Sequence, residues 1–180
     1  RKHIPLKVGL GLNSGPAVVG NMGSELRIDY SVLGDTVNLA ARLEGQSKSY
    51  GMNVVLGPPT RAAVKDRLAT IDLDYIQVKG KTEGTYIYGL MGDGEVLADP
   101  KFKYLQNLIF DAMETYRAMQ WDEAQAMFDE IRDLGSDEKK PWILEANLHV
   151  LCDLYDERIT EYKETPPDPD WDGVFIATTK

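Results

Sequence analysis

The chain has 180 residues, of which 29 are acidic, 20 are basic and one is a cysteine. Its net charge of −9 argues against a nucleic-acid-binding protein, because contact with phosphates needs a basic face. A single Cys excludes an internal disulfide framework or a Cys-rich zinc module, and no stretch of eighteen apolar residues could span a bilayer. The chain starts at Arg1 without an initiator Met or a signal-peptide pattern, which indicates a piece of a longer protein.

The charge and the composition divide the chain near residue 95. Residues 1–95 carry a net charge of +1, and residues 96–180 carry −10. Of the 16 glycines, 14 come before residue 96, whereas all three Trp come after it. We therefore predict two structural units, 1–95 and an acidic helical extension over 96–180, joined by a turn-rich segment at 92–100.

The first unit begins with alternating apolar and small or polar residues over 6–12, which predicts a strand. Residues 13–16 form a turn signal, and 17–20 are expected to return as the second strand of a hairpin. A helix is predicted from Asp35 or Thr36 to near Gly51, because the apolar period changes there and an Asp or Thr can cap its start.

The rest of the first unit alternates short strands and helices. A buried strand is expected over 53–56, a helix opened by two prolines over 58–67, and two strands over 71–78 and 85–90. This irregular alternation favours an α+β fold, in which helices cover one face of a sheet.

The second unit shows helical spacing of apolar residues within 102–116, 121–131 and 142–162, which predicts three helices. The residues around Tyr116 and Trp121 are similar to one tetratricopeptide-like helix pair, but no second copy at a fixed period indicates a solenoid. A Pro-, Asp- and Trp-rich tail over 166–173 follows, and we expect Trp171 and the apolar 174–176 stretch to dock on the fold. Asp168, Asp170 and Asp172 have the spacing of a calcium loop, but its twelfth position is not Glu, which favours turn-capping carboxylates.

Three stretches carry the chemistry: 15–34, 34–44 and 78–81. Asn38 and Arg42 are four residues apart, so they share one face of the predicted helix, where an amide and a guanidinium suit a sugar oxygen and a phosphate. Lys79 and Lys81 flank a glycine in a hairpin loop, where an ammonium can meet a polyphosphate. Ser31 lies just before the helix and can donate or accept a hydrogen bond.

In order and spacing, these stretches resemble the C-terminal half of the class III adenylate/guanylate cyclase catalytic domain, over about residues 6–90. The resemblance implies a ferredoxin-like βαββαβ core that works as a head-to-tail homodimer with active sites at the interface. Each site would hold two Mg²⁺ or Mn²⁺ ions on two Asp of one subunit and receive the helix with Asn and Arg from the other. The implied reaction converts ATP to cyclic AMP and pyrophosphate in signal transduction.

The resemblance assigns a role to each candidate residue. Asn38 matches the asparagine that orients the ribose, and Arg42 matches the arginine that stabilises charge on the reacting phosphate. Lys79 is the better match for the triphosphate-binding lysine, with Lys81 the alternative. Ser31 falls at a base-reading position and favours ATP over GTP.

The metal-binding Asp residues of the family belong to its N-terminal half, which is not among these residues. Asp29 and Asp35 do not fall at those positions, so we assign no metal ligand in this chain and expect the chain alone to be inactive. Two alternatives stay open: a catalytically inactive cyclase-homology regulatory module, and a helical interaction scaffold in which residues 96–180 are the functional part. Asn38 and Arg42 would then be a solvated helix face, and the lysines would only solubilise the loop.

The acidic extension resembles the C-terminal extension of bacterial cyclases that carry an extracellular sensor and transmembrane helices before the catalytic domain. This likeness implies a membrane-anchored parent, with the present chain on the cytoplasmic side of the plasma membrane. It leaves the role of the extension open: packing on the catalytic domain, supporting the dimer, or binding a regulator.

Overall fold

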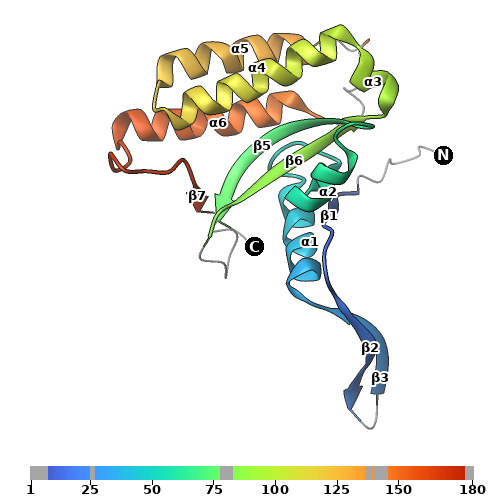
Figure 1. Ribbon diagram of the computed structural model, residues 1–180. Coiled ribbons are helices and arrows are strands. Elements are labelled where there is room, and N and C mark those ends of the chain that lie inside the picture. The colour runs from blue at the N-terminus through green and yellow to red at the C-terminus, as the bar shows by residue number, and fades with distance from the viewer. Residues whose placement is uncertain (1–7, 25–26, 78–82, 137–138, 140–145, 177–180) are drawn as a thin grey trace, which may run out of the picture.

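The computed structural model describes residues 8–24, 27–77, 83–136, 139 and 146–176. These residues form a five-stranded mixed sheet in the order β1-β4-β6-β5-β7, a layer of helices against it, and a separate two-stranded hairpin that projects from the body (Figure 1). The α+β class predicted from the sequence is therefore confirmed.

One βαβ unit opens the described chain. Strand β1 (Leu10–Leu12) leads through the hairpin to α1 (Asp35–Gln46), and β4 (Val54–Leu56) returns parallel to β1. Helix α1 packs so closely on β1 that a Cβ at Gly11 would come within 2.1 Å of the Ala40 carbonyl oxygen. A complete βαββαβ core needs further elements that the described residues do not contain, so the ferredoxin-like arrangement stays a prediction.

The projecting hairpin differs from the sequence prediction. Strand β2 (Val18–Ser24) pairs antiparallel with β3 (Arg27–Leu33) and not with β1, so the prediction that 17–20 returns along 6–12 is wrong. The turn between β1 and β2 is bound to α1 instead: Asn13 Nδ2 donates to the Thr36 carbonyl, and Thr36 Oγ1 donates to the Pro16 carbonyl. These bonds direct the chain away from the sheet.

The remaining strands complete the sheet. Strands β5 (Ala69–Gln77) and β6 (Thr85–Gly92) form its longest antiparallel pair, and helix α2 (Pro58–Val64) precedes them. Strand β7 (Phe175–Ile176) pairs parallel with the last residues of β5, so the chain returns to the sheet near its C-terminus.

Four helices make up most of the extension: α3 (Gly94–Ala98), α4 (Pro100–Arg117), α5 (Trp121–Gly135) and α6 (Leu148–Glu164). Asp93 and Asp99 start α3 and α4 by accepting hydrogen bonds from backbone N–H groups of the first turn. The three predicted helices are confirmed, although α6 begins at Leu148 and not at 142: Ala146 forms a β-bridge, and residues 142–145 lie outside the described residues. Helix α3 lies in the segment 92–100, where the sequence analysis expected turns. The tetratricopeptide-like pairing stays a prediction.

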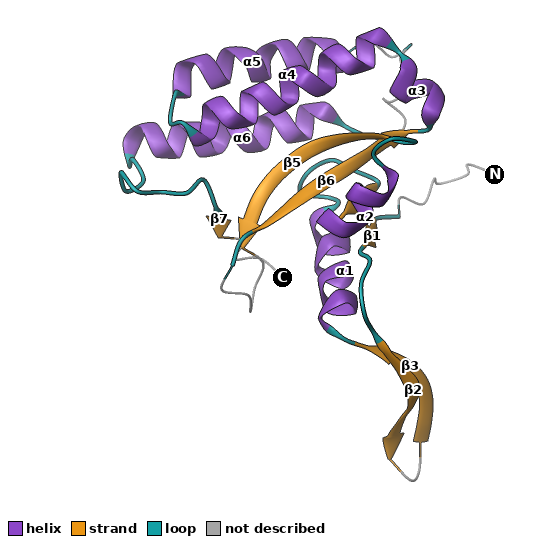
Figure 2. Cartoon of the chain, in the orientation of Figure 1, coloured by secondary structure: helices purple, strands orange, loops and turns teal. Residues whose placement is uncertain are grey.

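Helices α4, α5 and α6 lie together beside β5 and β6 (Figure 2). Helices α4 and α6 occupy the edge of β5 that faces away from β6: Gln106 Nε2 of α4 donates to the Thr70 carbonyl, and the Tyr155 hydroxyl of α6 donates to the Leu73 carbonyl at 2.7 Å. An open strand edge is a site of aggregation, and these side chains occupy it.

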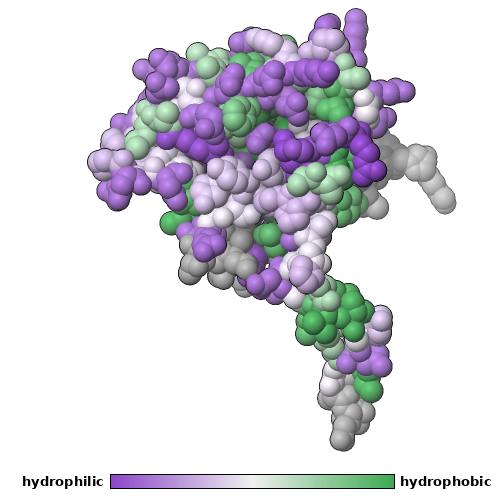
Figure 3. Space-filling view, viewed as in Figure 1, coloured by the Kyte–Doolittle hydropathy of each residue, from purple (hydrophilic) through white to green (hydrophobic). Residues whose placement is uncertain are grey.

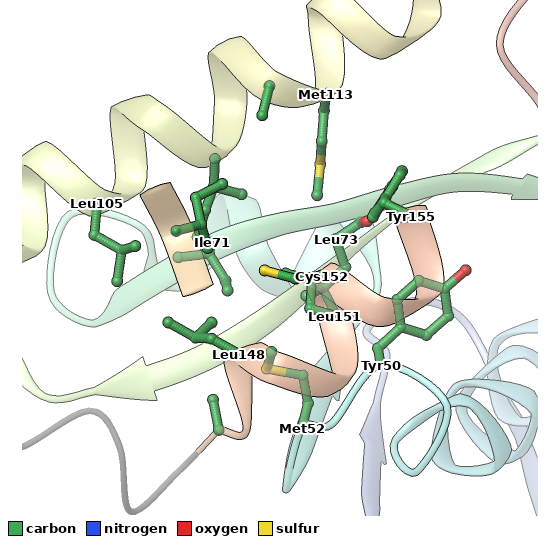
Figure 4. Close-up of a cluster of buried hydrophobic side chains, with 14 of the residues drawn as sticks. Tyr50, Met52, Ile71, Leu73, Leu105, Met113, Leu148, Leu151, Cys152 and Tyr155 are labelled. Atoms are coloured by element: carbon green, nitrogen blue, oxygen red, sulfur yellow. The ribbon is translucent and has the colours of Figure 1, made fainter. Parts of the chain in front are cut away.

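The buried side chains form one core that runs from the sheet into the extension (Figure 4). Members from both parts include Tyr50, Met52, Ile71, Leu73, Ile87, Met91, Leu105, Met113, Leu148, Leu151, Cys152 and Tyr155. The residue 95–96 boundary falls inside α3, and the division into two domains stays a prediction. Burial raises the pKa of the Cys152 thiol to about 12, as suits a core residue.

The tail docks on the helices as predicted. The centroid of the Trp171 ring lies 5.3 Å from the Tyr162 ring centroid and 5.6 Å from the Tyr116 ring centroid. Trp171 Nε1 donates a hydrogen bond to the Val174 carbonyl. These contacts carry the chain to β7.

Candidate functional site

Helix α1 begins abruptly at the base of the projecting hairpin. Gly34 has φ 149° and ψ 161°, a backbone conformation that is essentially limited to glycine. Its carbonyl accepts the backbone N–H groups of Val37 and Asn38, both at 3.1 Å. The chain therefore changes from strand to helix within one residue, which places Asn38 in the first turns of α1.

Asn38 and Arg42 share one face of α1, as the sequence predicted. The Asn38 side chain is exposed and that of Arg42 is half-buried. With the residues that the structure describes, neither side chain makes a hydrogen bond or an ion pair. Their donors, an amide and a planar guanidinium, are therefore available to water or to a ligand at this face.

Ser31 lies on β3 opposite Gly20, three residues before Gly34. The hairpin leads away from the start of α1 (Figure 1), and no hydrogen bond joins Ser31 to Asn38 or Arg42 in the described part of the chain. The structure thus places Ser31 on the element that precedes α1 without bringing the three side chains into contact.

Lys79 and Lys81 lie outside the described residues. The structure places only the strands on either side, with β5 ending at Gln77 and β6 starting at Thr85. The predicted pair of strands around the lysine loop is confirmed.

The hairpin of β2 and β3 carries an apolar surface that the sequence analysis missed. Six of its large apolar side chains are at least 43% exposed (Figure 3): Val18, Val19, Ile28, Tyr30, Val32 and Leu33. An isolated two-stranded hairpin is marginally stable in water, so this surface suits contact with a further protein surface. Pairs of adjacent apolar residues within each strand could have predicted this surface. Neighbouring side chains of a strand point to opposite faces, so such pairs place apolar groups on both faces of the hairpin.

A second missed feature is a buried polar cluster at the other end of α1. Asp74 Oδ2 accepts the Tyr50 hydroxyl at 2.6 Å and Arg158 Nη1 at 2.6 Å. The Arg158 and Asp74 side chains are only 5% and 2% exposed. Burial, together with the Asp74 charge, raises the pKa of Tyr50 well above its ordinary value, so its hydroxyl keeps its proton and donates to Asp74.

The described residues show neither a metal-binding cluster nor a membrane-spanning helix. They contain no group of three or more His, Cys, Asp or Glu side chains that could hold a metal ion. None of the described helices combines the length and apolar character of a bilayer-spanning segment.

A family model described as the adenylate and guanylate cyclase catalytic domain matches residues 1–92, which is half of the chain. The region includes β1, the hairpin, α1 and the β5–β6 pair. The chain therefore belongs to the family of adenylate and guanylate cyclase catalytic domains.

Two curated relatives agree with this assignment. Adenylate cyclase 1 of Rhizobium meliloti is 39% identical over 82 residues, which cover 46% of this chain and 12% of that protein. The terminal-differentiation-specific adenylate cyclase of Dictyostelium discoideum is 30% identical over 142 residues, or 74% of this chain and 6% of that protein, so its similarity extends into the helical extension. Among solved structures, an adenylyl cyclase of P. aeruginosa is 34% identical, with a TM-score of 0.40 over 44% of this chain and 40% of that one. The chain thus spans only a small part of the curated relatives it matches.

Proposed function

We propose that this chain is the C-terminal half of an adenylate cyclase catalytic domain, which converts ATP to cyclic AMP and pyrophosphate within a longer protein. The observation that carries the proposal is the pair Asn38 and Arg42. Both lie on one accessible face of α1, inside the region that the cyclase family matches, without partners among the described side chains.

The reaction is an intramolecular displacement at the α-phosphate of ATP. The ribose 3′-oxygen forms a bond to the α-phosphorus and loses its proton, while the bond to the bridging oxygen breaks and pyrophosphate leaves with the electron pair. The Asn38 amide would orient the ribose by hydrogen bonding. The Arg42 guanidinium would contact the α-phosphate oxygens and stabilise the negative charge that develops on them.

Substrate binding and selection are assigned to three further residues by the resemblance to the family. Lys79, with Lys81 as the alternative, would bind the triphosphate, and Ser31 would read the base and favour ATP. Family membership alone is compatible with ATP or GTP, so Ser31 carries this choice. Initial rates of the full-length protein with each nucleotide test it, and a higher kcat/KM for GTP would contradict it.

Arg42→Ala in the full-length protein should lower kcat by about 100-fold or more and change KM little, because charge on the phosphate develops only in the transition state. Steady-state rates of cyclic AMP formation measure both constants. Lys48→Ala is the matched control, because Lys48 is an exposed cation just beyond α1. It should leave both kcat and KM unchanged. Unchanged turnover in Arg42→Ala would contradict the role of Arg42.

We infer that the parent works as a homodimer and that the projecting hairpin takes part in the contact. The support is its exposed apolar surface, which includes Ile28 at 64% and Tyr30 at 75% exposure. Ile28→Glu combined with Tyr30→Glu should shift the full-length protein from dimer to monomer and abolish cyclase activity, as sedimentation velocity and rate assays would show. Phe110→Glu, on the exposed side of α4, is the control. A dimer unchanged by the double substitution would contradict the contact.

The metal site is proposed for the other half of the catalytic domain, since the two metal-binding Asp of the family belong to that half and neither Asp29 nor Asp35 falls at their positions. The chain by itself should therefore make no cyclic AMP from ATP with Mg²⁺ or Mn²⁺. The likeness of residues 96–180 to the extension of membrane-anchored bacterial sensor cyclases supports a parent with this part on the cytoplasmic side. Fractionation of cells that produce the full-length protein tests that location.

A further inference from the structure

The extension contacts the segment that follows α1, residues 47–52, at two separate places. At the first, the Asn147 backbone N–H donates to the Gly51 carbonyl at 2.6 Å, and Met52 forms an isolated β-bridge with Ala146. Gly51 has φ 66°, and a Cβ there would lie 2.4 Å from the Asn147 carbonyl oxygen. This close approach to the start of α6 therefore requires glycine.

At the second place, Tyr50, Asp74 and Arg158 form a closed triangle of hydrogen bonds. The Tyr50 hydroxyl donates to Asp74, Arg158 Nη1 donates to the same carboxylate oxygen, and Arg158 Nη2 donates to the Tyr50 oxygen at 3.2 Å. The ring centroid of Phe175, on β7, lies 3.4 Å from the guanidinium carbon of Arg158. The triangle thus joins the α1 end, β5 and α6, and the tail covers it.

An irregularity in β5 makes this arrangement possible. In a regular strand Asp72 and Asp74 would face the same side, because side chains alternate. Asp72 lies opposite Tyr88 and Asp74 opposite Ile87, so the strand has one extra residue, Leu73, at this point. The resulting bulge turns Asp74 to the buried face, where it meets Tyr50 and Arg158.

The triangle is coupled to α1 through the backbone. The Tyr50 N–H donates to the Gln46 carbonyl at 3.1 Å, which continues the last turn of α1. Arg42 lies one turn before Gln46 on the same helix. The position of the Tyr50 ring therefore constrains the end of the helix that presents Asn38 and Arg42.

We propose that Arg158 of the extension is a positioning residue for the cyclase reaction, acting through Asp74 and Tyr50 to hold α1 in its working position. This inference rests on the proposed function of Asn38 and Arg42. Stability alone does not require such a triangle, because an apolar pair of similar volume is often at least as stable as a buried ion pair. Directional hydrogen bonds fix a helix end in a way that apolar contacts do not.

Two variants of the full-length protein separate position from stability. Tyr50→Phe removes the hydroxyl that joins α1 to the triangle and leaves the Arg158–Asp74 ion pair. Asp74→Leu combined with Arg158→Met replaces the ion pair by apolar groups and avoids an unpaired buried charge. Tyr104→Phe is the control for the first, because it removes a tyrosine–carboxylate bond between α4 and α5; Arg132→Met is the control for the second.

Both test variants should keep KM within about twofold and lower kcat about tenfold, because small displacements of a group that acts in the transition state cost rate more than binding. Amide hydrogen exchange of residues 42–52 should become about tenfold faster in both, while that of α4 stays unchanged. The two control variants should match the wild type in kcat and in exchange over 42–52.

The inference is overturned if both variants keep wild-type kcat and wild-type exchange over 42–52, or if kcat falls only in proportion to a general loss of folded protein. Failure of the proposed function gives a different result. A folded wild-type protein that makes no cyclic nucleotide from ATP or GTP with Mg²⁺ or Mn²⁺ would overturn the cyclase assignment, and with it any catalytic role of Arg158.

Discussion

The two acidic residues of β5 show how the surroundings of a side chain decide its role. Asp74 is paired with Arg158 inside the protein, whereas Asp72 faces the other side of the sheet, opposite Tyr88. On that side, the guanidinium carbon of Arg61 lies 5.0 Å from the centroid of the Tyr88 ring. Burial raises the pKa of Asp72, although Arg61 and Arg117 act in the opposite direction.

This shift has a consequence for stability against pH. Because its pKa in the folded state is above the ordinary value of 3.8, Asp72 binds a proton more readily in the folded than in the unfolded chain. Its contribution to the free energy of unfolding is therefore largest at acidic pH and is lost as pH rises through the folded pKa. An asparagine side chain cannot ionise, so the Asp72→Asn variant does not lose this contribution. The difference in free energy of unfolding between variant and wild type should therefore move in favour of the variant as pH rises.

Urea unfolding between about pH 3 and pH 7 measures the difference between the two proteins. Asp66→Asn, which changes an exposed carboxylate, serves as the control for the substitution itself. A difference for Asp72→Asn that stays constant, or that moves in favour of the wild type as pH rises, would contradict the raised pKa.

At the scale of elements, the close contact of α1 with β1 places the face that carries Asn38 and Arg42. Glycine makes this contact possible, because a Cβ at Gly11 would overlap the Ala40 carbonyl oxygen and come within 2.2 Å of the Glu44 nitrogen. Both obstructing atoms belong to the helix backbone and cannot rotate away. The helix as a whole would have to move.

Gly11→Ala should therefore lower the free energy of unfolding by about 2 kcal/mol or more and disturb α1. Gly45→Ala is a control of opposite sign: it lies within α1 with no atom near an added Cβ, so it should raise the free energy by up to about 1 kcal/mol. Denaturant unfolding of the two variants measures the contrast. Equal effects of the two changes would show that the β1–α1 contact is looser than described.

At the scale of the whole molecule, the extension completes the sheet. Helices α4 and α6 bind two backbone carbonyls at the edge of β5, and side chains of the extension share one core with Ile71, Leu73 and Met91. Each fully buried apolar side chain contributes about 1.5–3 kcal/mol, and the net stability of a domain is only about 5–15 kcal/mol. The sheet is thus not expected to persist without the helices.

A chain that ends at Ala98 should consequently show no cooperative thermal transition by circular dichroism and should aggregate. A chain that ends at Glu164 keeps the three long helices and should still unfold cooperatively, at a lower temperature than the full chain. Cooperative unfolding of the shorter chain would instead support two independent domains. It would also favour the alternative in which residues 96–180 act as a separate scaffold.

Much of the fold follows from local patterns that the sequence displays. Apolar spacing predicted α1, α4 and α5 and the strand pair β5–β6, because each element buries one face with its own period. The docking of Trp171 was expected in place of a calcium loop in the tail. The i, i+4 relation of Asn38 and Arg42 follows from helix geometry alone, so that part of the site was predictable.

The sequence by itself therefore determined the family, through three motifs in order, as well as the long helices α1, α4 and α5 and the polar face of α1. The helices and this face depend on residues close together in the chain. The tertiary structure decided the rest. The 13–16 turn forms hydrogen bonds to α1 and does not lead back along β1, and the burial of Asp74 depends on an extra residue in β5. The contact between Arg158 and the end of α1 joins residues 108 positions apart, and no local pattern specifies a partner at that distance. The net charge of −9 showed the same limit: composition located an acidic extension, and only the packed chain showed that it shares a core with the neutral half.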